Sequence, residues 1–102
     1  MGSEKLTLSI HDRKQLEGLV KEAIKDAKSS TFLARKMIPS QGDSRDFAYG
    51  LICGIVIGNF IERFTKDNGR QPDKDETADL FLIMMTKMPS IRRAVMNVLE
   101  SA

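Results

Sequence analysis

The sequence predicts an all-α protein: a bundle of three to four helices around a central, glycine-striped apolar helix, preceded by a short N-terminal strand or extended arm. Apolar residues recur at helical spacing through most of the chain, and the 15 residues from Phe47 to Ile61 carry no charge. Gly, Pro and capping residues divide the chain into segments of helical length. Since 102 residues suit one domain, we expect a single helical domain over residues 1–102.

Residues 5–10 alternate between polar and apolar side chains, which is the period of a strand. We therefore expect 1–11 to be an extended arm, with Ser9 or Asp12 capping the helix that follows. That helix is predicted over 12–38 and ends at Pro39. If continuous, it would be about 40 Å long, whereas a compact chain of this size is about 33 Å across. We expect it to protrude, to pair with another subunit, or to break at 29–31, where three weak helix formers follow one another.

The second helix is predicted over 44–67, capped by Asp43 or Ser44 and ended by Asn68-Gly69, a left-handed C-terminal signal. The third is predicted over 74–88, because Asp73-Lys74-Asp75-Glu76 has the pattern of a capping box. Pro89 is expected to break or kink it. The fourth helix is predicted over 90–101.

The most informative feature is a stripe of three glycines, Gly50, Gly54 and Gly58, which lie on one helix face within about 80° of each other. Each costs about 1 kcal/mol relative to Ala inside a helix, so close approach of another backbone is expected to offset the cost. Three alternatives remain open for this face: packing within the chain, a dimer interface, or contact with a ligand. Phe47 and Ile61 complete the predicted helix-packing or dimer surface.

The remaining faces of this second helix are apolar as well, which predicts a central helix surrounded on every side. Its charge-free stretch spans about 22 Å, less than the roughly 30 Å hydrocarbon core of a bilayer. We therefore expect a buried helix of a soluble protein and no membrane partner.

The composition excludes several classes of function. A single Cys and a single His do not build a disulfide scaffold or an ordinary zinc site, and they favour a cytoplasmic location. His11 is expected at the surface, and Cys53 inside the apolar helix. The acids between the second and third helices lack the glycine of a calcium loop, so we assign them to helix capping. We expect no enzyme, no catalytic or metal-binding residues and no cofactor.

Two patterns suggest nucleic acid as an alternative partner. The alternating segment 5–10 followed by a helix resembles the opening of ribbon-helix-helix repressors over about the first 38 residues, and this resemblance implies that Lys5, Thr7 and Ser9 contact the major groove. Separately, residues 88–93 have the composition of the start of a recognition helix, with Arg92 and Arg93 exposed.

These observations favour a small non-enzymatic helical protein that acts by protein–protein interaction, self-associating through its helices as a homodimer. The alternative is a DNA-binding regulator that uses the N-terminal arm or Arg92 and Arg93. A third hypothesis is a small ligand-binding protein or enzyme, because the glycine stripe would leave room for a ligand.

Overall fold

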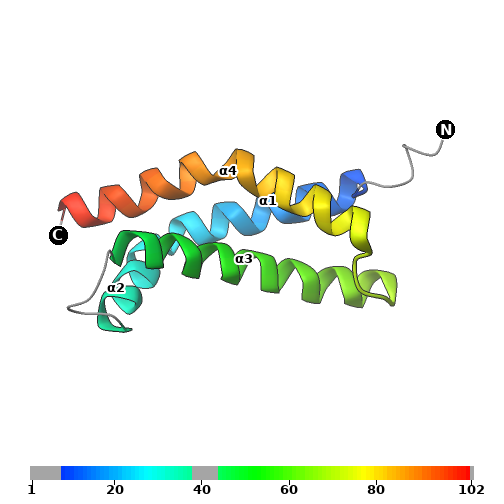
Figure 1. Ribbon diagram of the computed structural model, residues 1–102, viewed down its shortest axis with the longest axis horizontal. Helices are drawn as coiled ribbons and strands as arrows, with labels where there is room; N and C mark the ends of the chain where they lie inside the picture. Colours follow the sequence, from blue (N-terminus) through cyan, green and yellow to red (C-terminus); the bar gives the residue numbers. More distant parts are fainter. Residues whose placement is uncertain (1–7, 38–43, 102) are drawn as a thin grey trace.

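The computed structural model describes residues 8–37 and 44–101, which form four helices and, within those ranges, no strand. They are α1 (Ile10–Lys25), α2 (Ala27–Met37), α3 (Ser44–Asn68) and α4 (Lys74–Ser101). Figure 1 shows α1 and α4 running in one direction and α3 returning between their ends, with α2 at the end where α3 begins. The predicted all-α bundle is confirmed. It is elongated, with extents of 50 × 22 × 22 Å.

The first helix begins two residues earlier than predicted, at Ile10, because Ser9 is its cap. The Ser9 hydroxyl accepts a hydrogen bond from the backbone N–H of Asp12 at 3.0 Å, which satisfies a donor in the first turn. Residues 1–7 of the predicted arm lie outside the described residues. Leu8, the first described residue, is buried, and its N–H donates to Asp79 of α4 at 2.9 Å.

The predicted helix 12–38 is divided, but the prediction of a break at 29–31 is wrong. The division occurs at Asp26, whose φ of −92° and ψ of 11° depart from helical values, while its N–H still bonds to the Glu22 carbonyl at 3.1 Å. Ser30 N–H then bonds to the Asp26 carbonyl at 3.1 Å, so the chain bends without a loop. Packing decides the position, because the buried side chains of α2 are small and let it lie against α3 and α4: Ala27, Thr31 and Ala34.

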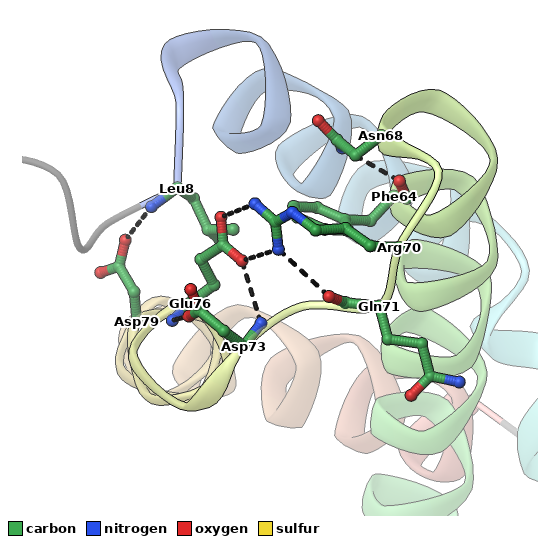
Figure 2. Close-up of polar contacts among 8 residues, drawn as sticks. All are labelled: Leu8, Phe64, Asn68, Arg70, Gln71, Asp73, Glu76 and Asp79. Carbon is green, nitrogen blue, oxygen red and sulfur yellow. Dashed lines mark hydrogen bonds and ion pairs between the residues drawn. The ribbon is translucent and has the colours of Figure 1, made fainter.

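The turn between α3 and α4 follows the predicted signals (Figure 2). Gly69 adopts a φ of +70°, which favours glycine, and its N–H bonds to the Thr65 carbonyl at 2.8 Å. The capping box forms reciprocally: Glu76 N–H donates to the Asp73 carboxylate at 2.8 Å, and Asp73 N–H donates to the Glu76 carboxylate at 2.9 Å. The predicted boundaries at 67 and 74 are therefore correct to within one residue.

The predicted third and fourth helices, 74–88 and 90–101, are a single helix, so the prediction that they are separate is wrong. Pro89 lies inside α4 and is exposed. A proline removes one N–H and displaces the carbonyl four residues earlier, here that of Met85, which is also exposed. Because this disruption lies on the solvent side, the freed carbonyl is accessible to water, and packing of the opposite face holds the helix together.

The core forms where one stripe of α3 meets α1 and α4. The α3 stripe repeats every four residues and is completely buried: Ala48, Ile52, Val56, Phe60 and Phe64. It packs with Leu16, Leu19 and Val20 of α1 and with Leu80, Met84, Ile91 and Val95 of α4. The prediction that α3 is surrounded on every side is wrong. Three neighbouring helices in a bundle this slender cover one side of a helix, and the opposite side of α3 stays exposed.

Candidate interaction surface

The exposed side of α3 carries the glycine stripe. Gly50, Gly54 and Gly58 are all exposed, and a Cβ atom added to any of them would meet no heavy atom of another element within 4 Å. The first of the three explanations for the stripe, packing within the chain, is therefore wrong: no described residue packs on these glycines. The stripe lies directly opposite the buried stripe of α3, because residues 50, 54 and 58 each fall midway in sequence between two buried positions.

Larger apolar side chains flank the glycines. Phe47 and Ile61 are half-buried, as is Ile57, and all three also pack against the core at their inner edges. We call this surface the glycine face and define it by six residues: Phe47, Gly50, Gly54, Ile57, Gly58 and Ile61. The structure thus brings together the five residues that the sequence predicts for an interface and adds Ile57.

The apolar surface around the glycine face extends onto α4. α3 and α4 are antiparallel, and their register is set by Cys53 Sγ, which lies 3.1 Å from Met88 Sδ, and by the Arg92 guanidinium, 6.0 Å from the centre of the Tyr49 ring. The same register places two exposed α4 side chains at the height of the glycine face along the helix axis: Met85, 67% exposed, level with Ile57, and Phe81, 50% exposed, level with Ile61. Met85 is exposed while its neighbour Met84 is buried, as their adjacency in a helix requires.

α3 has the length and the composition of a membrane-spanning helix. The segment Arg45–Asn68 is long and apolar enough to cross a bilayer, and 28% of its apolar window is buried in the bundle. A mostly buried core helix of a soluble protein passes the same test, so length and apolarity alone are weak evidence. What distinguishes α3 is that its uncharged outer side is left open.

Three of the residues predicted to contact nucleic acid are described, and these three do not form one surface. Lys5 and Thr7 lie outside the described residues, and the Ser9 hydroxyl is engaged in capping α1. Arg92 lies over Tyr49 on the α3 side of α4, whereas Arg93 faces a cleft on the α1 side. No helix begins near residue 90, so the predicted recognition helix is wrong.

A network of ionic and hydrogen-bonding contacts joins the N-terminal segment to the α3–α4 turn. Arg70 binds both carboxylate oxygens of Glu76, at 2.7 and 3.0 Å, and stacks on Phe64 with 5.2 Å between the guanidinium and the ring centre. These hydrogen bonds hold the pKa of Glu76 below its ordinary value and raise the pKa of Arg70. Asp79 pairs with Arg13 of α1 at 2.8 Å. Figure 2 shows Glu76 bound to Arg70 and to the Asp73 N–H, and Asp79 bound to the Leu8 N–H, so these acids have a structural role.

The single histidine and the single cysteine lie at different places in the bundle. His11 is exposed and lies 3.7 Å from Asp67, at the end of α3 remote from Phe47. Cys53 is half-buried between α3 and α4, and this burial raises the pKa of its thiol. Residues 8–37 and 44–101 contain no cluster of three potential metal ligands.

Comparison of the chain with protein-family models, with curated protein sequences and with solved structures gave no match.

Proposed function

We propose that this chain is a non-enzymatic helical protein that acts by protein–protein interaction, and that it binds a second copy of itself through the glycine face. One observation carries the proposal: three glycines of α3 are exposed, and no described element of the chain packs on them.

The three exposed glycines lower the stability of the single chain. Three glycines inside a helix destabilise it by about 3 kcal/mol relative to alanines, against a total stability of about 5–15 kcal/mol for a small domain. Among residues 8–37 and 44–101 no side chain packs on the glycines to offset this cost, because the space above each glycine is open. A partner helix lying against the stripe would offset it, since small residues let two backbones approach and make continuous van der Waals contact.

The charge pattern supports an apolar partner. An outer helix face in water normally carries charged side chains, yet Phe47–Ile61 has none, and Asp46 and Glu62 stand immediately outside it. A second copy of this helix presents a matching uncharged, glycine-lined face, and two-fold pairs of like surfaces are the commonest form of soluble oligomer.

The area needed for a stable dimer indicates how far the interface extends. A strip of α3 from Phe47 to Ile61 is about 22 Å long and about 10 Å wide. The area of this strip is well below the roughly 800 Å² that each partner contributes to a standard interface. Met85 and Phe81 widen the apolar surface onto α4. We therefore place both helices in the interface, with the glycine face at its centre.

Sedimentation velocity over a wide range of protein concentration tests this proposal. We expect the native chain to form dimers and the Gly54→Leu variant to remain monomeric with unchanged helical circular dichroism, because the leucine side chain would hold the partner helix away. Gly18→Leu is the matched control: Gly18 is an exposed glycine of α1 whose added Cβ also meets nothing within 4 Å. This variant should dimerise like the native chain.

Two results would overturn the proposal. The first is a native chain that stays monomeric at every concentration, or a Gly54→Leu variant that dimerises as well as the native chain. The second is co-sedimentation of the native chain, but not of Gly54→Glu, with neutral phosphatidylcholine vesicles, which would show that the glycine face contacts lipid. Gly18→Glu serves as the control for adding a charge.

A further inference from the structure

A second surface lies away from the glycine face, in a cleft between the α1–α2 bend and the C-terminal half of α4. The bend and the C-terminal half of α4 lie at the same end of the molecule in Figure 1. The cleft has a volume of about 440 Å³ and contains no residue of α3. This volume is within the range of about 300–1,000 Å³ typical of small-ligand sites.

The floor of the cleft is apolar. Ile24 and Ala27 contribute from the bend, and Ala94 and Val98 contribute from α4. Ala27 is buried and the other three are half-buried, so part of their apolar surface is still open to water. An apolar ligand group covering this floor would remove that surface from water, which is favourable.

The polar groups around this floor are cationic or neutral. Lys25, Lys28 and Arg93 line the cleft, together with the hydroxyl-bearing Ser90. Lys25 and Lys28 lie on either side of the bend, so the division at Asp26 brings them to face Arg93, which is 65 residues further along than Lys28. The cleft has no acidic lining residue, and Asp26 itself is not part of the lining.

These cations are not neutralised within the bundle. Among residues 8–37 and 44–101, no ion pair joins Lys25, Lys28 or Arg93 to a carboxylate, and Lys28 makes only a contact with the Phe32 ring, at 5.9 Å. By contrast, Arg13 and Arg70 each bind an acid. Three like charges around one cleft repel each other, and an anion placed among them relieves this repulsion.

We propose that this cleft binds a small anionic amphiphile, a molecule with a carboxylate or phosphate head and an apolar tail. The head lies among Lys25, Lys28 and Arg93, and the tail covers Ile24, Ala27, Ala94 and Val98. The proposal is independent of self-association through the glycine face, because the two surfaces share no residue.

An NMR titration of backbone amide shifts in the full chain tests this inference, with decanoate and decyl phosphate as probes below their micelle concentrations. Decanol supplies the tail without the charge, and acetate and inorganic phosphate supply the charge without the tail. We expect both amphiphiles to shift the amides of residues 24–28 and 90–98, with affinities at least tenfold above those of the three partial probes. Decanoate and decyl phosphate together determine which head group the cleft prefers.

Charge variants separate cleft binding from general attraction to a basic protein. Arg93→Gln and Lys28→Gln should each weaken binding up to about fivefold, the range for an exposed charge pair. Arg63→Gln, which removes an exposed cation from α3, should leave affinity unchanged. The inference would be overturned by absence of binding, by decanol binding as tightly as decanoate, by equal effects of Arg63→Gln and Arg93→Gln, or by amide shifts centred on residues 47–61.

Discussion

Replacing Gly50, Gly54 and Gly58 together with alanine should make the single chain more stable and its self-association weaker. Each glycine lies in a helix with negative φ, is exposed, and has open space where the methyl group would be. The substitution therefore introduces no strain and restricts the unfolded chain, which stabilises by about 1 kcal/mol per site and about 3 kcal/mol for all three. For a urea dependence of about 2 kcal/mol/M, the midpoint of unfolding would rise by about 1.5 M.

The same three methyl groups would destabilise the dimer relative to the single chain. Alanines along the stripe hold two facing helices further apart and reduce the contact between their backbones. We expect the dissociation constant to rise at least tenfold. Urea unfolding followed by circular dichroism at low protein concentration measures the stability of the single chain, and sedimentation measures association.

Gly18→Ala provides the control for helix propensity alone. It should stabilise the chain by about 1 kcal/mol and leave association unchanged, since Gly18 lies on α1 outside the glycine face. A triple variant that associates as tightly as the native chain, or that is no more stable than the native chain at low concentration, would contradict this role of the glycines.

Three further predictions concern the interior of the bundle. Thr31 is fully buried in α2 and its hydroxyl has no hydrogen-bond partner among the residues that the structure describes, so Thr31→Val should raise the free energy of unfolding by about 1 kcal/mol; a loss of stability in urea would show that the hydroxyl is satisfied in solution. Because the folded pKa of Glu76 is depressed, its contribution to stability should be fully present above its unfolded pKa, about 4.3, and be lost as the pH falls through the folded pKa. Glu76→Gln should therefore flatten this acid dependence, and an unchanged slope would contradict the assignment. Burial raises the pKa of Cys53, so alkylation by iodoacetamide at pH 8 should be slower than for Cys in an unfolded peptide; equal rates would mean that α3 and α4 separate readily.

The helix boundaries that were predictable depend on interactions between residues close in sequence. Ser9 bonds three residues ahead, Gly69 provides a left-handed turn, and Asp73 and Glu76 exchange bonds across three residues. Such contacts form by the same local geometry in any fold, so their residue patterns are readable without the tertiary structure.

Three features were decided by packing between distant segments. Pro89 does not end α4, because its disrupted side faces solvent while the other side is held in the core. The bend falls at Asp26, where the small side chains of α2 meet α3 and α4. The basic cleft depends on this bend, which places Lys28 opposite Arg93.

The sequence by itself determined that α3 is an uncharged helix with a glycine stripe on one face. It did not determine whether that face is covered, because periodicity shows which residues share a side of a helix and not how many neighbours are available to pack on it. The tertiary structure decided this point. α1, α2 and α4 cover the side that carries Ile52 and Val56, and no described element covers the opposite side, which has Gly54 at its centre.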